Sequence, residues 1–158
     1  MEDFDKFYNK ALKFLSYRPR SEKEIVDKLK TKKAPEEIVD KIIKKLKEYK
    51  FLDDSEFARA WIQSRVRSGP RSWKTILFEL KKKGINDEIA QKQIANFKNQ
   101  TPDEKMAKIL LKKRIHRLEN KNLSKEKIYQ KLGMFLASKG FDWNTIKKSI
   151  DEMLSKKV

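Results

Sequence analysis

The sequence predicts an all-α protein built from three tandem three-helix repeats, helix-turn-helix-like triplets that stack in an elongated, curved array. Glycine and proline occur only four times each among 158 residues, and so few breakers disfavour a turn-rich β fold. Apolar residues recur every three or four positions nearly throughout, which is the spacing of amphipathic helices. Residues that commonly begin helices stand between these apolar stretches.

The first triplet is expected over residues 1–50. Its first apolar stripe ends near Arg18–Pro19, and the run from Ser21 to Glu24 is typical of a capping box. In a capping box the serine oxygen accepts a backbone N–H, while the glutamate reaches back to the serine N–H. Pro35 precedes two acids and suits the first turn of a third helix, because proline needs no donor there and acids favour a helix N-terminus.

The same organisation is expected over residues 51–100 and 101–158. The remaining helices each follow a residue whose side chain can cap them: Asp53, Ser72, Asn86, Thr101, Ser124 and Asp142. The run from Thr101 to Glu104 is predicted to be a second capping box, with proline at the first helical position.

Spacing within the triplets repeats along the chain. Pro19-Arg20-Ser21 recurs 51 residues later as Pro70-Arg71-Ser72, and Gly84-Ile85 recurs 56 residues later as Gly140-Phe141. Both glycines suit the left-handed position that follows a helix. Such a period is typical of solenoid-like arrays, in which each unit buries its open face on the next.

The net charge of +17 comes from 40 Lys and Arg against 23 Asp and Glu. A high lysine content can reflect growth at high temperature, but proteins of thermophiles are enriched in glutamate as well as in lysine. Here the acids do not keep pace, so an anionic partner explains the excess better. Basic residues are densest from Phe57 to Ile85 and from Lys105 to Arg117. We therefore expect the chain to bind nucleic acid, directly or within a nucleoprotein complex.

Residue types that are missing narrow the function further. The chain has no cysteine, which excludes disulfides, thiolate zinc sites and a cysteine nucleophile. No apolar run is long enough for a membrane span or a signal peptide. A cytoplasmic location without membrane contact is therefore expected.

Residues that could carry catalysis have simpler structural explanations. His116 is the only histidine and has no acid beside it to orient it as a general base. Asp53 and Asp54 could bind Mg²⁺ as in nucleases, but metal chemistry needs further carboxylates, and a helix cap is expected here. No phosphate-cradling glycine loop is present. No enzyme activity, cofactor or metal site is therefore expected.

The tryptophans are expected mainly in the core. Trp61 lies on an apolar helix stripe, and Trp143 begins a helix. Cations flank Trp73, so stacking on unpaired bases stays open beside core packing for that residue.

Several ordered motifs carry a family resemblance: Arg20-Ser21-Glu22-Lys23-Glu24-Ile25, Lys28-Leu29, Tyr49-Lys50-Phe51-Leu52-Asp53-Asp54 and Lys83-Gly84-Ile85. In this order and spacing they resemble the RecX family of recombination regulators. The resemblance runs from about Ala11 to Ile94 and continues weakly through Ser138-Lys139-Gly140-Phe141. Lys33 and Lys50 stand where the family usually has glycine.

The resemblance implies three tandem three-helix repeats that bind the RecA recombinase. RecX-like proteins lie in the groove of the RecA filament on single-stranded DNA. They usually inhibit its ATP hydrolysis, strand exchange and coprotease activity, which places them in recombination, DNA repair and the SOS response. The implied partners are the RecA filament, single-stranded DNA and, more weakly, duplex DNA. A monomer without cofactor or catalytic residues is expected.

Fourteen cations are expected to contact DNA or the filament: Arg59, Arg65, Arg67, Arg71, Lys74, Lys81, Lys82, Lys83, Lys112, Lys113, Arg114 and Arg117, with Arg18 and Arg20 as lesser candidates. Two rival functions remain open. A helix-turn-helix transcriptional regulator would need dimer symmetry and base-reading side chains. A metal-dependent nuclease would centre on Asp53 and Asp54.

Overall fold

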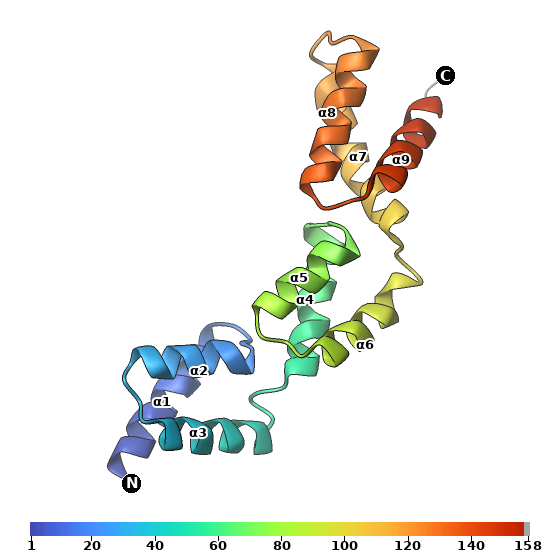
Figure 1. The fold of residues 1–158 in the computed structure, drawn as a ribbon. Coiled ribbons are helices and arrows are strands. Elements are labelled where there is room, and N and C mark those ends of the chain that lie inside the picture. Colours follow the sequence, from blue (N-terminus) through green and yellow to red (C-terminus); the bar gives the residue numbers. More distant parts are fainter. Residues whose placement is uncertain (157–158) are drawn as a thin grey trace. The chain divides into compact units, whose positions relative to one another are not determined.

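The computed structural model describes residues 1–156 and contains nine α-helices and no strand in that range (Figure 1). In chain order they are α1 (Glu2–Tyr17), α2 (Glu22–Thr31), α3 (Glu36–Glu48), α4 (Asp54–Ser68), α5 (Trp73–Lys82), α6 (Asp87–Lys98), α7 (Asp103–Glu119), α8 (Lys125–Ser138) and α9 (Trp143–Ser155). The predicted all-α class is confirmed. The last two residues of the expected third triplet lie outside the described range.

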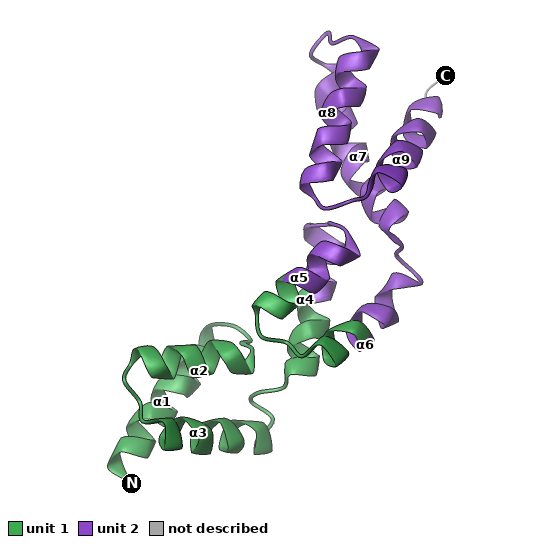
Figure 2. Ribbon diagram, viewed as in Figure 1, with its two compact units in different colours: residues 1–61, 79–91 green, residues 62–78, 92–158 purple. Residues whose placement is uncertain are grey.

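The helices divide into two compact units (Figure 2). Unit 1 comprises residues 1–61 and 79–91, and unit 2 comprises residues 62–78 and the chain from residue 92 onward. The division passes through α4, α5 and α6, so the middle triplet contributes helix segments to both units. The helices of the first triplet belong wholly to unit 1, and those of the third wholly to unit 2.

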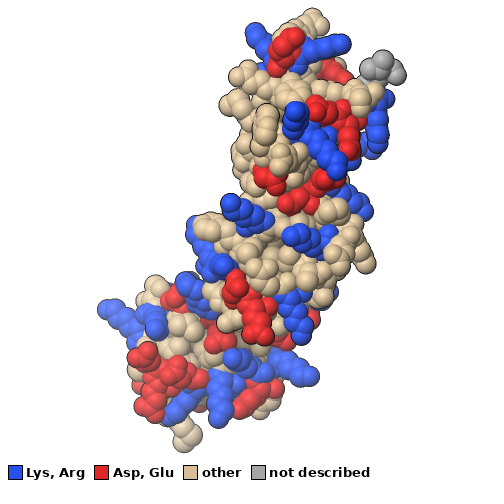
Figure 3. All heavy atoms as spheres, turned by 45° about the vertical axis from the view of Figure 1, so that its right-hand side comes forward, with Lys and Arg blue, Asp and Glu red and all other residues tan. Residues whose placement is uncertain are grey.

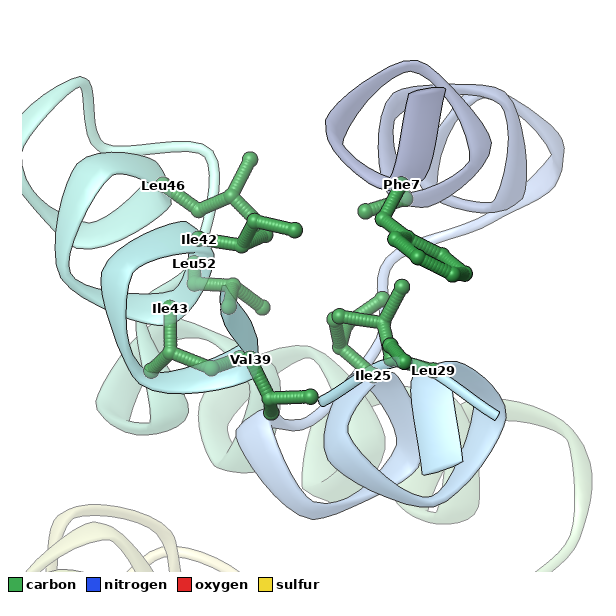
Figure 4. Close-up of a cluster of buried hydrophobic side chains, with 10 residues drawn as sticks. Phe7, Ile25, Leu29, Val39, Ile42, Ile43, Leu46 and Leu52 are labelled. Atoms are coloured by element: carbon green, nitrogen blue, oxygen red, sulfur yellow. The ribbon is translucent and has the colours of Figure 1, made fainter. Parts of the chain in front are cut away.

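A cluster of apolar side chains from α1, α2 and α3 holds the first triplet, and these side chains point toward one another in Figure 4. Ile25 and Leu29 are buried on α2, as are Ile42 and Leu46 on α3. Each pair is four positions apart and therefore lies on one side of its helix. Burial of each such side chain contributes about 1.5–3 kcal/mol before the entropy of folding is counted.

The third triplet has its own core in unit 2, where α7 packs against both α8 and α9. Leu111 and Ile115 are buried on α7, and Leu132 and Leu136 are buried on α8. These pairs repeat the four-residue spacing seen on α2 and α3. The apolar pattern that predicts the helices therefore also marks their core faces.

Most of the predicted capping residues act as expected. In each case the side-chain oxygen of the capping residue accepts a hydrogen bond from a backbone N–H two or three residues later. Ser21 accepts from Glu24, Asp53 from Ser55 and Glu56, Ser72 from Thr75, Asn86 from Glu88, Ser124 from Lys127, and Asp142 from Thr145. Ser21 also forms the predicted capping box, because Glu24 accepts the Ser21 N–H at 3.0 Å.

The predictions for the two helix-starting prolines are wrong by one position. Pro35 and Pro102 directly precede α3 and α7 instead of occupying their first turns. The capping box predicted from Thr101 does not form, since no side chain caps the start of α7. Instead the Thr101 carbonyl and the Asp103 carboxylate accept the Trp73 indole and backbone N–H groups, each at 2.8 Å.

A hydrogen-bonded joint connects the first triplet to the second within unit 1. At the start of α2, the Ser21 hydroxyl donates to the Lys83 carbonyl at 2.7 Å, and the Glu22 N–H donates to Asp54 at 2.9 Å. Gly84 follows α5 with a φ of 79°, and a β-carbon there would lie 2.5 Å from the β-carbon of Lys23. Glycine is therefore required both by the backbone conformation and by the close approach.

A second joint with the same parts connects the middle triplet to the third within unit 2. The Ser72 N–H and the Thr75 hydroxyl donate to the Lys139 carbonyl at 3.1 and 3.3 Å, and the Trp73 N–H donates to Asp103. Gly140 follows α8 with a φ of 87°, and a β-carbon there would overlap the Thr75 hydroxyl. Each joint thus combines the start of one triplet's second helix with two parts of the next triplet: the aspartate that begins its first helix and the glycine that follows its second helix.

Lys33 and Lys50 occupy left-handed backbone, with φ of 61° and 57°. This conformation costs a residue with a β-carbon about 1–2 kcal/mol, and part of the relief from glycine is lost to its greater unfolded-state entropy. Lys33→Gly and Lys50→Gly are each expected to raise the free energy of unfolding by about 0.5 kcal/mol, measured by urea denaturation. Lys32→Gly is the control, because Lys32 has a φ of −84° and should lose stability. A loss in all three variants would contradict the prediction.

Candidate functional site

One group of predicted cations lies together on an outer face of α7. Lys112, Lys113 and Arg117 are exposed and, with His116, line a hollow of about 710 Å³ that Glu119 also borders. Their spacing places them on one side of the helix. Within residues 1–156, no carboxylate lies within 4.0 Å of the two lysines or of Arg117. These four residues, Lys112, Lys113, His116 and Arg117, are called the α7 basic face.

Three predicted cations of the middle triplet, all in unit 1, pair with carboxylates. The pairs are Arg59 with Glu56 at 3.0 Å, Lys81 with Asp87 at 2.8 Å and Lys83 with Glu24 at 3.1 Å. Figure 3 likewise shows acidic side chains among the basic ones on the displayed face. An anionic ligand would have to compete with these carboxylates for the three cations.

The other predicted cations of α4, α5 and their connection differ in exposure. Arg67 and Lys74 in unit 2 and Lys82 in unit 1 are exposed. Arg65 and Arg71 are half-buried beside Gly69, whose carbonyl accepts a hydrogen bond from the Arg71 Nε at 3.2 Å. The exposed cations can meet a ligand without rearrangement, whereas Arg71 also orders the turn between α4 and α5.

Two predicted arginines pack against aromatic rings. The Arg20 guanidinium lies 3.7 Å from the Phe14 ring centroid, and that of Arg114 lies 5.0 Å from the Phe135 centroid. The Nε atoms of both arginines are buried, with no hydrogen-bond partner in the described part of the chain. A cation over a ring contributes about 0.5–2 kcal/mol, more when it is desolvated. Both arginines therefore have a packing role that charge counting missed.

Glu24 gathers donors at the joint of unit 1. It accepts hydrogen bonds from Arg18 at 2.7 Å, the Ser21 N–H at 3.0 Å and Lys83 at 3.1 Å. Burial alone would raise the pKa of Glu24, but these donors outweigh it and lower the pKa from 4.5 to about 2. The predicted contact residue Arg18 is therefore held by an anion of the chain itself.

The neighbouring acids Asp53 and Asp54 have separate structural roles. Asp53 caps α4 as predicted, whereas Asp54 accepts the Glu22 N–H in the first joint. Burial, opposed by that hydrogen bond, raises the pKa of Asp54, and Asp103 in the second joint shifts in the same direction for the same reason. No cluster of three His, Cys, Asp or Glu side chains that could hold a metal occurs among residues 1–156.

Trp73 lies in the core, which was the main expectation for it, whereas Trp143 does not. Trp73 is only 3% exposed, and its indole N–H donates to the Thr101 carbonyl. Stacking of this ring on a base is therefore excluded. Trp143, which was expected in the core, is 62% exposed. It lines an apolar groove with Gly133 and Met134 that the sequence reasoning missed, although a glycine inside a helix was a visible signal.

No helix in the described range combines the length and the apolar character needed to cross a bilayer. The three triplets of the chain are connected by two hydrogen-bonded joints, and the exposed α7 basic face lies on one helix of the third triplet. These features define the class: a tandem helical-repeat protein with an exposed basic face on one helix.

Comparison with known proteins identifies the family. The first three-helix domain of RecX matches residues 8–46, the second matches residues 53–92 and the third matches residues 102–150. The three matches cover most of the chain, so it belongs to the RecX family. The predicted tandem arrangement and the family resemblance are thereby confirmed.

Curated relatives carry the name Regulatory protein RecX. The Bacillus velezensis protein is 35% identical over 153 residues, which span 96% of this chain and 56% of the relative. The Clostridium tetani protein is 32% identical over 153 residues, which span 97% of this chain and 69% of the relative. The chain thus spans about half the length of the Bacillus relatives it matches. Their names describe these relatives as regulatory proteins.

Solved structures have the same fold. The crystal structure of RecX from Lactobacillus salivarius matches with a TM-score of 0.78 and 29% identity, covering 96% of both chains. A second structure, of a regulatory protein RecX, matches with a TM-score of 0.76 and 29% identity, covering 94% of this chain and 72% of that one.

Proposed function

We propose that this protein regulates the RecA recombinase by binding the RecA filament on single-stranded DNA, and that it acts as an inhibitor. Binding would lower ATP hydrolysis, strand exchange and coprotease activity, in recombination, DNA repair and the SOS response. The protein would act in the cytoplasm as a monomer, without a cofactor or catalysis of its own. Membership of the RecX family supports the partner, and the charge of +17 supports contact with a polyanion.

The α7 basic face is the observation that carries the DNA part of this proposal. Its lysines and Arg117 are exposed on one helix and have no carboxylate within 4.0 Å among the described residues. Unpaired cations on one face can each meet a phosphate and release its counterions. The exposed Arg67, Lys74 and Lys82 are secondary contacts in the proposal, and the carboxylate-bound Arg59, Lys81 and Lys83 are weaker ones.

Binding of this protein along the filament would explain inhibition without any catalytic step of its own. A protein bound to several neighbouring recombinase subunits holds them in one arrangement. It would thereby block either the addition of subunits or the movement tied to ATP turnover. A ligand shifts such an equilibrium only by its differential affinity for the two arrangements.

The alternative, a helix-turn-helix transcriptional regulator, has less support. The start of a recognition helix normally reads base edges. In α5 that position is Trp73, which is buried and bonded to Thr101 and Asp103. A binding isotherm that prefers one duplex sequence over random DNA would favour the alternative.

Charge reversal of the α7 basic face tests the proposed function. The triple variant Lys112→Glu, Lys113→Glu and Arg117→Glu is expected to bind single-stranded DNA about tenfold to a hundredfold more weakly at low salt. Its salt dependence should lose about 0.7 in slope for each phosphate contact removed. The variant should also need a higher concentration to halve the ATPase rate of RecA on single-stranded DNA.

The matched control reverses three exposed lysines of unit 2 that lie outside α8 and α9, namely Lys92, Lys98 and Lys121, which gives the same net charge. This control should retain most of the DNA affinity and of the ATPase inhibition. Equal losses in both triple variants would show that only the overall charge matters. An unmodified protein that leaves the RecA ATPase rate unchanged would refute the proposed function.

A further inference from the structure

The apolar groove between α8 and α9 has the composition of a protein-binding surface. It is a hollow of about 720 Å³ lined by Tyr129, Gly133, Met134, Ala137, Trp143 and Ile146, with Lys125 and Glu126 among the other lining residues. Met134 and Trp143 are 67% and 62% exposed. Tryptophan, tyrosine and methionine are enriched where proteins bind one another, and methionine adapts to irregular partners.

The groove lies on the face that the other two triplets use to receive helices. The left-handed residue after each second helix, namely Lys33, Gly84 or Gly140, serves to align the three triplets. Eleven residues before it stand Glu22, Trp73 and Tyr129, which are therefore equivalent positions. The Glu22 N–H binds Asp54 at the start of α4, and the Trp73 N–H binds Asp103 at the start of α7. At both joints this position therefore meets the first helix of the following triplet.

On this face the third triplet lacks the helix-start N–H group that binds an aspartate in the two joints. Because α8 begins four residues before Tyr129, the N–H of Tyr129 lies inside the helix and needs no carboxylate acceptor. Gly133 stands where Val26 and Leu77 stand in the earlier triplets, and the missing side chain opens the hollow. A helix that docks here would use apolar side chains instead of a capping aspartate.

We infer that this groove receives an amphipathic helix of the protein partner, with a bulky apolar side chain of that helix seated over Gly133. The inference rests on the proposed function, so the helix belongs to a recombinase subunit. It divides the contacts of the third triplet, with α8 and α9 holding the recombinase and the α7 basic face holding DNA.

A second copy of this chain fits the groove less well. At both joints the incoming triplet presents a glycine, Gly84 or Gly140, whose missing β-carbon allows the close approach. The first triplet has Lys33 at this position. The first triplet of another copy would therefore bring a β-carbon and a long side chain to the point where the joints require none.

Gly133→Leu is the test, since it fills the groove without crowding the core. A β-carbon at Gly133 would have Ile146 as its nearest neighbour, at 4.0 Å, and leucine is a better helix former than glycine. Binding is measured to immobilised RecA filaments assembled on single-stranded DNA with a slowly hydrolysed ATP analogue. We expect about tenfold weaker filament binding, with unchanged affinity for naked single-stranded DNA and no decrease in the urea midpoint.

Ala95→Leu is the matched control, because it adds an exposed leucine to α6 outside the groove; it should bind filaments like the unmodified protein. If the unmodified protein binds filaments and Gly133→Leu binds them equally well, the inference is wrong and the proposed function stands. If the unmodified protein does not bind filaments, both fail. Sedimentation that shows self-association lost in Gly133→Leu, with filament binding intact, would assign the groove to a second copy and overturn the inference.

Discussion

Gly140→Ala is expected to lower the free energy of unfolding by about 3 kcal/mol or more. A φ of 87° is unfavourable by about 1–2 kcal/mol for a residue with a β-carbon. That β-carbon would also overlap the Thr75 hydroxyl and approach the Ser72 hydroxyl to 2.7 Å. Relieving the overlap would displace the hydrogen bonds to the Lys139 carbonyl, and a lost hydrogen bond costs about 1 kcal/mol.

The same substitution at Gly133 of α8 should have the opposite sign. Gly133 lies inside the helix, and its β-carbon would meet nothing closer than 4.0 Å. Gly133→Ala is therefore expected to stabilise the protein by about 0.5–1 kcal/mol through helix propensity. Urea denaturation of both variants, monitored by circular dichroism, measures the difference. Two variants of equal stability would refute the described geometry of the second joint.

Glu24→Gln is expected to lower the stability by about 2–3 kcal/mol at pH 7. The carboxylate is only 16% exposed and accepts hydrogen bonds from Arg18, Ser21 and Lys83. A glutamine has the same shape but carries no charge, so it leaves Arg18, Lys83 and the more distant Arg20 without their partner. Hydrogen bonds to charged groups are stronger than neutral ones by about a factor of two, which explains the size of the effect.

The contribution of Glu24 to the free energy of unfolding is expected to depend on pH. The pKa of Glu24 falls from 4.5 in the unfolded chain to about 2 in the folded one. The unfolded state therefore binds the proton more tightly, and the stabilisation is complete above the unfolded pKa and disappears as the pH falls toward 2. The stability difference between the unmodified protein and Glu24→Gln should shrink from pH 5 to pH 2. A difference that stays constant over this interval would contradict the assignment.

Local patterns in the sequence predicted the helices well. Capping needs only a short polar side chain and an N–H two or three residues later, so Ser21, Asp53, Ser124 and Asp142 could be recognised from their neighbours alone. The prediction for the start of α7 was wrong because Asp103 accepts its hydrogen bond from the N–H of Trp73, thirty positions earlier. No short-range pattern contains that contact, and the burial of Trp73 follows from it.

The candidate site was only partly accessible to sequence reasoning. A count of cations cannot separate Lys112, which has no carboxylate near it in the described structure, from Lys83, which binds Glu24 across fifty-nine positions. Likewise it cannot reveal that Arg20 and Arg114 lie over aromatic rings. The apolar groove depends on the absence of a side chain at Gly133, which becomes informative only when the three triplets are compared position by position.

The two joints also limit how such a chain can change length during evolution. A triplet cannot be inserted or removed as an independent block, because the N–H groups of Glu22 and Trp73 need the aspartate of the following triplet. The glycine after the second helix of that triplet must accompany the aspartate, since Lys23 and Thr75 occupy the space of its β-carbon. Duplication therefore has to copy an acid and a glycine together, and a copy that loses either one would become an end of the array.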